Sequence, residues 1–362
     1  KTLVAIYISF FILNMLLGEF IMHVKSKDRN KNKRIYLFLT TLQYGLLAGF
    51  RATGMSYDTG AYEIVFNRVH AGWNNLTANT SWVENGYYVL CLAIKTLGGD
   101  FRTLLIISSL FIVASTSIFV YRHSKDVLLS VFFLISFPYF YTSMDIIRHY
   151  IALSWVLLGY KYVEEQKFIK YLIFILIGVQ FHAFAYLMIP IYFLYKLKWT
   201  KLSGSIYVIT TALIYFFINN VARAVTALIG KSVENYNYWI GGAAGGIKTA
   251  LMYVVLAVII GIAYQNILKK NKTTDLALNS TMLLLASAVI YTNARLFIRV
   301  LVAMLPIVAI SIPDLLCDKG NVVDEKKRFL SKTSIILIGL AYHMYMLLVN
   351  WQNVVPYVPY WK

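Results

Sequence analysis

Long apolar runs recur along the whole chain, and they restrict its fold more than any other feature. Several runs reach about 20 residues, the length at which an α-helix rising about 1.5 Å per residue crosses a hydrocarbon layer of roughly 30 Å. Hydrophobic residues make up 59% of the 362 residues and charged residues 14%, which is more apolar surface than one water-soluble domain can bury. The runs also lack the period-two alternation of barrel strands. We therefore predict an all-α polytopic membrane protein.

The runs and their flanking residues predict about twelve spans in a single membrane domain that covers residues 1–362. The predicted spans are 2–24, 35–51, 101–121, 127–142, 146–163, 168–181, 183–196, 203–221, 247–268, 275–293, 294–313 and 331–350. Two of them, 168–181 and 183–196, are short, so Phe181-His182-Ala183 is either a tight outer turn or a break in one long tilted helix. Residues 86–98 are too short to cross, and we predict an interfacial or re-entrant helix there.

The basic residues predict the orientation. If the N-terminus is outside, the loops on the cytoplasmic side hold 22 of the 34 lysines and arginines. These loops are 23–34, 122–126, 161–170, 196–202, 269–274 and 314–332. Such a bias is the positive-inside distribution of membrane proteins. It accounts for most of the net charge of +18, and it argues against nucleic-acid binding because the charges lie in short loops rather than on one folded face.

Two larger loops on the predicted outer side are rich in aromatic residues. The loop 52–100 contains the short helix and carries Tyr62 and Tyr87, and the loop 222–246 carries Tyr238 and Trp239. Aromatic rings beside carboxylates suit the faces and hydroxyls of sugars, although a belt of interfacial aromatic residues has the same composition. The four named residues are candidate sugar-binding residues.

Five arginines lie where predicted spans meet the outer interface: Arg51, Arg148, Arg223, Arg295 and Arg299. A charge costs about 2.5 to 3.5 kcal/mol at the centre of a membrane helix and less near the interface, so several on one face indicate an anionic partner in a cavity. The alternative is snorkelling of each side chain to lipid phosphate. Arg295 and Arg299 are four residues apart and are expected to share a helix face. Because a guanidinium forks onto phosphate oxygens, this spacing suits a diphosphate.

Three further side chains on the predicted outer side could take part in chemistry: His182, Glu84 and Asp58. Neutral imidazole is well suited to accept a proton near neutral pH, although His182 could equally be a hydrogen-bonded packing histidine. Glu84 and Asp58 lie among aromatic residues of the first predicted outer loop, where contact with sugar hydroxyls and a solvated loop are equally good explanations.

The other acidic residues give little sign of a metal site. The chain has no D-x-D or H-E-x-x-H motif and no phosphate-binding glycine loop, so we expect neither a metal nor a cofactor. Asp145 precedes Arg148 and His149 by three and four residues, so a helical ion pair with either one is an adequate explanation for it.

Several of these residues resemble motifs of the EpsG-like branch of the bacterial Wzy-type polysaccharide polymerases. The matching segments are Arg51-x-x-Gly54 with Asp58 and Tyr62, Glu84-Asn85-Gly86-Tyr87, Arg148-x-x-x-Ala152, Phe181-His182, Arg295 and Val355-Pro356-Tyr357. Gly54 and Asp58 are four residues apart, farther than in the usual first-loop pattern of that family. The resemblance covers nearly the whole chain.

The resemblance implies a GT-C-like glycosyltransferase in the bacterial cytoplasmic (plasma) membrane, with its active site on the extracytoplasmic side. Such an enzyme polymerises undecaprenyl-pyrophosphate-linked oligosaccharide repeat units into capsular or exopolysaccharide. The arginines would stabilise the departing pyrophosphate, and His182, or else Glu84 or Asp58, would accept the proton of the attacking hydroxyl. The expected partners are the lipid-linked donor and acceptor, the lipid bilayer, a flippase and a chain-length regulator.

Two other functions share parts of this pattern. A lipid-linked oligosaccharide flippase or other transporter would also collect arginines near an anionic head group, but transporters usually keep their site at the midplane and show repeated halves. An O-antigen-type ligase or a membrane acyltransferase is the second alternative. A ligase differs from a polymerase only in its acceptor.

Overall fold

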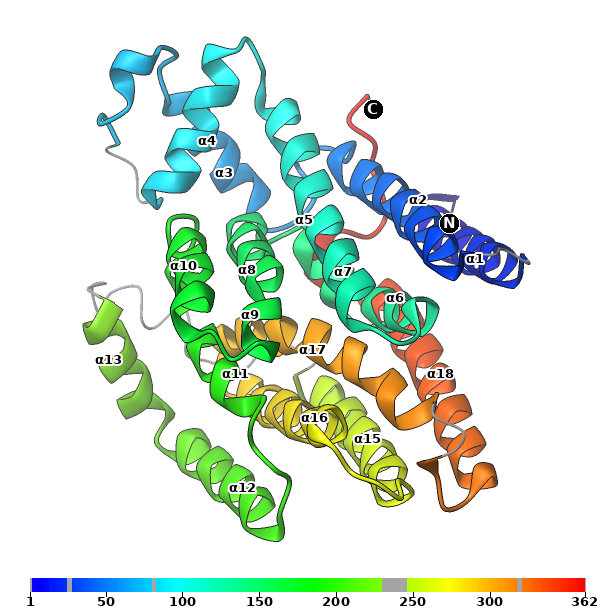
Figure 1. Cartoon of the computed structure of the whole chain (residues 1–362). Coiled ribbons are helices and arrows are strands. Elements are labelled where there is room, and N and C mark those ends of the chain that lie inside the picture. Colours follow the sequence, from blue (N-terminus) through cyan, green and yellow to red (C-terminus); the bar gives the residue numbers. More distant parts are fainter. Residues whose placement is uncertain (1, 25–27, 80–82, 230–245, 318–320, 362) are drawn as a thin grey trace. The chain divides into compact units, whose positions relative to one another are not determined.

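The computed structural model describes residues 2–24, 28–79, 83–229, 246–317 and 321–361, and this part of the chain is helical (Figure 1). Within it, six stretches are long and apolar enough to cross a membrane. They are Val4–His23 of α1 (Thr2–His23), α5 (Phe101–His123), α15 (Gly246–Gln265), α16 (Lys272–Tyr291), Arg295–Leu316 including α17 (Ile298–Leu316), and α18 (Glu325–Leu348). The helical membrane fold is thus confirmed, and the chain is an integral membrane protein. The number of twelve spans stays a prediction.

Other helices occupy most of the remaining predicted spans. They are α2 (Arg29–Gly49), α6 (Val127–Ser136), α7 (Tyr139–Ser143), α8 (Ile147–Gly159), α9 (Lys161–Glu164), α10 (Phe168–Val179), α11 (Ile189–Leu194), α12 (Lys201–Phe216) and α13 (Ile218–Ile229). The span predicted over 127–142 is interrupted at Phe137-Pro138, between α6 and α7, because proline lacks the N–H that a continuing helix needs. Asp126 begins α6 by accepting the N–H of Leu129 at 3.1 Å, which satisfies a helix-end donor.

The first predicted outer loop, residues 52–100, is itself partly helical. It contains α3 (Thr59–Arg68), the 3-10 turn η1 (Trp73–Asn75) and α4 (Asn85–Thr96). The helix α4 coincides with the segment 86–98 that was predicted to be too short to cross. Its position relative to a bilayer stays a prediction. In the second predicted outer loop, residues 230–245 lie outside the described residues, and with them Tyr238 and Trp239.

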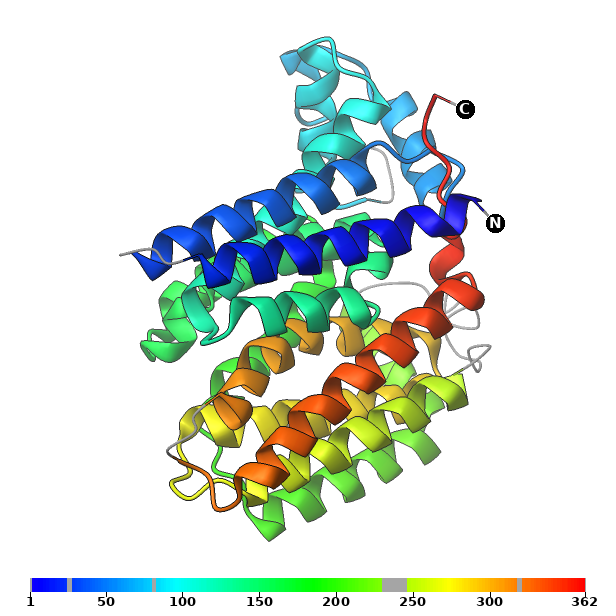
Figure 2. The same ribbon diagram turned by 90° about the vertical axis from the view of Figure 1, so that its right-hand side faces the viewer.

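The chain divides into two compact units, residues 1–189 with 343–362 and residues 190–342. In the first unit, α2 packs against α1 and α5, and α8 packs against α5 and α10 (Figures 1 and 2). Glycine allows the close approach of α2 and α5, since a Cβ on Gly49 of α2 would lie 2.9 Å from the Cα of Ile106 in α5. In the second unit, α16 packs against α12, α15 and α17.

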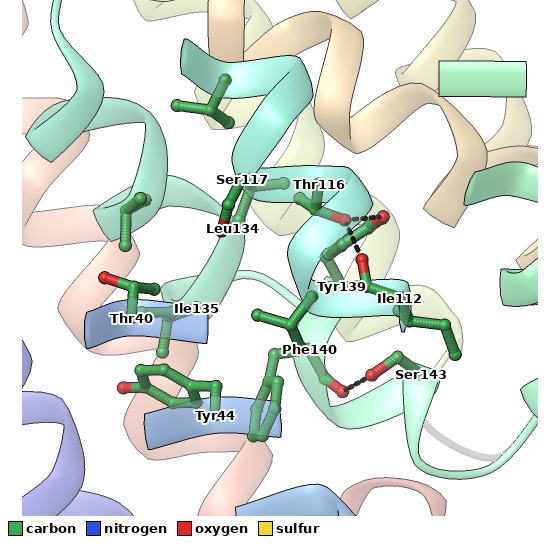
Figure 3. A pocket seen from close by; sticks show the side chains of 13 residues that line it. Thr40, Tyr44, Ile112, Thr116, Ser117, Leu134, Ile135, Tyr139, Phe140 and Ser143 are labelled. Carbon is green, nitrogen blue, oxygen red and sulfur yellow. Dashed lines mark hydrogen bonds between the residues drawn. The ribbon is translucent and has the colours of Figure 1, made fainter. Parts of the chain in front are cut away.

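A cavity lies inside the first unit between α2, α5, α6 and α7 (Figure 3). Most of its lining is aliphatic or aromatic, and two of its hydroxyl groups lie in contact with each other. Thr116 Oγ1 donates to the carbonyl of Ile112 at 2.8 Å and lies 2.9 Å from the hydroxyl of Tyr139. None of the candidate site residues lines this cavity.

Candidate functional site

The centre of the candidate site is an ion pair between Arg148 and Glu84. Arg148 lies in the first turn of α8, and Glu84 immediately precedes α4. The guanidinium donates to Glu84 Oε2, and the two side chains are only 7% and 19% exposed. Because both side chains are largely buried, removal of either partner would leave an uncompensated buried charge, which costs about 3 to 5 kcal/mol.

Two tyrosine rings flank this guanidinium. Its central carbon lies 5.5 Å from the ring centroid of Tyr62 and 5.9 Å from that of Tyr87, within the range of a cation–π contact. Tyr62 is 3% exposed and Tyr87 is fully buried. In this structure both rings therefore surround Arg148 and have little surface open to a sugar. Their role in sugar binding stays a prediction.

The segment Glu84-Asn85-Gly86-Tyr87 docks on the turn that contains His182. Glu84 Oε1 accepts the backbone N–H of Ala183 at 3.3 Å, and the N–H of Gly86 donates to the carbonyl of Gln180 at 2.8 Å. Gly86 is required by space, because a Cβ there would lie 2.7 Å from the Gln180 carbonyl oxygen. The acidic-glycine motif and the Phe-His motif, about a hundred residues apart, are thus two sides of one contact.

The chain reverses direction at this turn. α10 ends at Val179, and the 3-10 segment η2 (Ala183–Met188) returns alongside it, so that the hydroxyl of Tyr171 donates to the carbonyl of Met188 at 2.9 Å. Of the two alternatives for this region, the tight turn is the one observed.

The hydrogen bond of His182 decides which ring nitrogen carries its proton. Nδ1 accepts the backbone N–H of Phe184 at 3.1 Å, and the residue is 6% exposed. A neutral imidazole that accepts at Nδ1 carries its hydrogen on Nε2 and is therefore a donor there. To act as a base through Nε2, His182 would first have to give up the bond from Phe184. The geometry thus favours a donating role over the accepting role predicted for it.

Asp145 has a different partner from the helical one expected of it. Its Oδ1 accepts the backbone N–H of Asp58 at 2.8 Å, and the hydroxyl of Ser56 and the N–H of Tyr57 also donate to it. The expected pairing with Arg148 or His149 was wrong, because Asp145 precedes α8 and bonds residues 56–58 instead. Burial, with a smaller contribution from the nearby Asp58 carboxylate, raises the pKa of Asp145 to about 7.

This shift predicts that stability falls as pH rises. The folded pKa is about 7 and the ordinary value is 3.8, so the stability associated with protonated Asp145 is complete below about pH 4 and is lost as pH rises through 7. Between pH 5 and pH 8 the loss is about 2 to 3 kcal/mol at most. We expect the thermal unfolding midpoint of detergent-purified protein to fall over this range. Asp145→Asn, which keeps an acceptor oxygen, should remove most of the fall, and an unchanged pH dependence would contradict the assignment.

Asp58, unlike the buried His182, keeps part of its side chain exposed. It is half-buried, and its Oδ2 accepts the hydroxyl of Tyr62 at 3.3 Å. Because the Tyr62 ring also faces Arg148, contacts run without interruption from Asp58 through Tyr62 and Arg148 to Glu84. From Glu84 they continue to the turn at His182. The structure therefore brings the three predicted bases and Arg148 into one region of the first unit.

Arg51 is held differently from Arg148. It is fully buried and donates to the carbonyls of Ala48 and, at 2.6 Å, Met144. Beside it the C-terminal segment pairs with the chain, since the N–H of Ala52 donates to Val358 at 2.7 Å and the hydroxyl of Tyr357 donates to Leu47 at 2.9 Å. Arg51 thus joins three segments of backbone. Its predicted role in pyrophosphate binding is untested by these contacts.

The other three arginines belong to the second unit. Arg295 is exposed in the 3-10 turn η4 (Arg295–Phe297), and Arg299 is half-buried in α17, which begins at Ile298. The 3-10 turn leads directly into α17, and the expectation that both arginines share a helix face stays a prediction. Arg223 of α13 is exposed and donates to Asn219 and Asn220. Pyrophosphate binding by these residues stays a prediction.

Comparison with known protein families shows to which family this chain belongs. The model described as the EpsG family matches residues 34–360, which include every candidate residue discussed above. The chain belongs to the EpsG family. This family is associated with exopolysaccharide biosynthesis. No curated protein and no solved structure matches significantly.

The sequence did not single out two residues of the candidate site. Asp145 was explained by its neighbours in sequence, yet its partner Asp58 is 87 positions away. Tyr57 was one tyrosine among many, but 70% of its surface is exposed while the neighbouring Tyr62 is buried. The available signal was the position of Tyr57 directly beside a candidate base.

Proposed function

We propose that this EpsG-family protein polymerises undecaprenyl-pyrophosphate-linked oligosaccharide repeat units into capsular or exopolysaccharide at the outer leaflet. The observation that carries the proposal is the buried Arg148, fixed by Glu84 and two tyrosine rings next to Asp58 and the His182 turn. Such a preorganised cation beside an accessible carboxylate suits a reaction in which an anionic group leaves and a hydroxyl loses a proton.

In the proposed reaction, the hydroxyl oxygen of the acceptor repeat attacks the anomeric carbon of the donor glycan. The bond from that carbon to the pyrophosphate oxygen breaks, and the electron pair leaves with undecaprenyl pyrophosphate. The proton of the hydroxyl passes to a carboxylate. Atoms and charge balance without any further reactant.

Arg148 is assigned to the departing pyrophosphate. A guanidinium has five N–H donors, more than the Glu84 carboxylate can engage. It can therefore bind a phosphoryl oxygen without losing its ion pair, and the pair keeps its plane in a fixed direction. Because the negative charge on the leaving oxygen grows as the bond breaks, this contact strengthens in the transition state.

Asp58 is assigned as the base and His182 as a hydrogen-bond donor. Asp58 is half-buried and engaged by one long bond from Tyr62, whereas Glu84 is occupied by Arg148 and Ala183. His182 presents an N–H at Nε2 because its Nδ1 is an acceptor. That N–H suits an oxygen of the lipid-linked substrate.

The leaflet on which single repeats accumulate tests the reaction class. A strain that lacks the protein is expected to accumulate lipid-linked single repeats on the outer leaflet, where they are accessible to an added glycosidase or lectin. Accumulation on the cytoplasmic leaflet would instead identify a flippase. Long lipid-linked glycans that fail to reach another acceptor would identify a ligase.

A further inference from the structure

The turn Ser56-Tyr57-Asp58 in the first outer loop is held in an unusual conformation. Ser56 has a φ of +79°, in the left-handed region that is costly for residues other than glycine. Such a conformation persists only when surrounding contacts fix it, and it is frequent at functional sites.

Contacts from three directions fix this turn. The N–H of Ser56 donates to the carbonyl of Asn353 in the C-terminal segment at 3.0 Å. The hydroxyl of Ser56 bonds that of Thr59 at the start of α3. The carboxylate of Asp145, which precedes α8, accepts the N–H groups of Tyr57 and Asp58. The backbone is thus fixed on both sides of Tyr57.

The result is an exposed aromatic ring beside an accessible carboxylate. Tyr57 is 70% exposed, although a large aromatic side chain gains free energy when it is buried. The other two tyrosines of this region, Tyr62 and Tyr87, are buried around Arg148. Of Tyr57, Tyr62 and Tyr87, Tyr57 is the one whose ring face is available to a ligand.

We propose that Tyr57 binds the acceptor sugar by stacking on its apolar face. The proposal rests on the proposed function and extends it by assigning the acceptor subsite. A pyranose has a face of C–H groups that packs on an aromatic ring, and the rigid backbone gives this ring a fixed position at little entropic cost. A hydroxyl of the stacked sugar then lies next to Asp58, the residue that follows in the chain. The ligand is the sugar residue that carries the attacking hydroxyl.

A single-transfer assay separates acceptor binding from donor binding. The donor is a lipid-linked repeat whose own attacking hydroxyl is replaced by hydrogen, so that it cannot serve as acceptor. The acceptor is a soluble glycoside of the repeat-unit oligosaccharide, without pyrophosphate, added at increasing concentration. Tyr57→Ala is expected to raise the acceptor KM about 3- to 10-fold, the range of one aromatic stacking contact. The donor KM and the unfolding midpoint should not change.

The controls distinguish stacking from other roles of an exposed ring. Tyr57→Trp and Tyr57→Phe are expected to retain the wild-type acceptor KM, because both keep an aromatic face. Trp73→Ala removes another exposed aromatic residue of the same loop, 57% exposed, and should also leave that KM unchanged. Rescue by Tyr57→Leu would indicate a contact with lipid rather than sugar and would overturn the proposal.

Failure of this inference differs from failure of the proposed function. If the wild-type protein forms product and Tyr57→Ala keeps the wild-type acceptor KM, the acceptor subsite is wrong while the polymerase assignment stands. If the wild-type protein forms no product from competent donor and acceptor, the polymerase assignment itself is contradicted, and the subsite is contradicted with it.

Discussion

Replacement of Arg148 by lysine is expected to lower the polymerisation rate about 10²- to 10³-fold, the usual effect of removing one donor that stabilises transition-state charge. Lysine keeps the positive charge next to Glu84 but loses the planar fork that engages a carboxylate and a phosphoryl oxygen together. The rate is measured as glycan formed per minute by purified protein in nanodiscs. The unfolding midpoint reports whether the variant is folded.

Alanine at this position is less informative, because it leaves Glu84 buried without its cation. The double variant Arg148→Met with Glu84→Gln removes both charges and should stay folded while remaining inactive. Arg68→Ala, an exposed arginine at the end of α3, is the matched control and should keep full activity. A folded double variant with near wild-type polymerisation would contradict the role of Arg148.

Asp58→Asn is expected to lower kcat about 10²- to 10⁴-fold, the contribution of a positioned general base, with little change in KM. His182→Asn should lower kcat less than about 10-fold, because an asparagine side chain can accept the N–H of Phe184 and still donate to a substrate oxygen. In this assignment only Asp58→Asn removes the group that accepts the proton, so the comparison of the two variants identifies the base.

The opposite ranking of these two variants would overturn the assignment. If His182→Asn were inactive and Asp58→Asn retained most of its kcat, the histidine would be the base despite its hydrogen bond to Phe184. Glu84→Gln provides the third comparison. Because Glu84 holds Arg148, that change should also impair the pyrophosphate contact, whereas Asp58→Asn should leave it intact.

The helical segments followed from local physical chemistry. An apolar run of sufficient length must be helical in lipid, because only a helix satisfies its own backbone there. The predicted ends of most segments consequently lie close to those observed, as for α1 and α5. Where helices are interrupted, the cause is also partly local, as at Pro138 between α6 and α7.

The residues that the site side chains contact could not be predicted from local sequence. Arg51 and Arg148 have similar positions beside predicted spans, yet Arg51 donates to backbone carbonyls, one of them 93 positions away, while Arg148 pairs with Glu84. Which neighbour a side chain meets depends on how distant helices pack. The same holds for Asp145, whose contact with the Ser56-Tyr57-Asp58 turn replaces the expected helical ion pair.

The surplus of positive charge has two separate explanations. Most lysines and arginines lie in the predicted cytoplasmic loops, where they act as orientation signals and need no ligand. Arg148 is different because it is almost fully buried and held in place by a carboxylate. Burial of a charge in a membrane protein is costly, so such a residue indicates function more strongly than any exposed arginine does.

The most direct test of the central claim is the stoichiometry of the reaction with purified protein. The protein in nanodiscs is supplied with lipid-linked repeat units alone, and both the glycan ladder and the released undecaprenyl pyrophosphate are measured. For the wild-type protein we expect one undecaprenyl pyrophosphate to be released for each glycosidic bond formed. For Arg148→Lys we expect both products to form at no more than about 1% of the wild-type rate. Folded wild-type protein that forms no ladder and releases no undecaprenyl pyrophosphate would contradict the account.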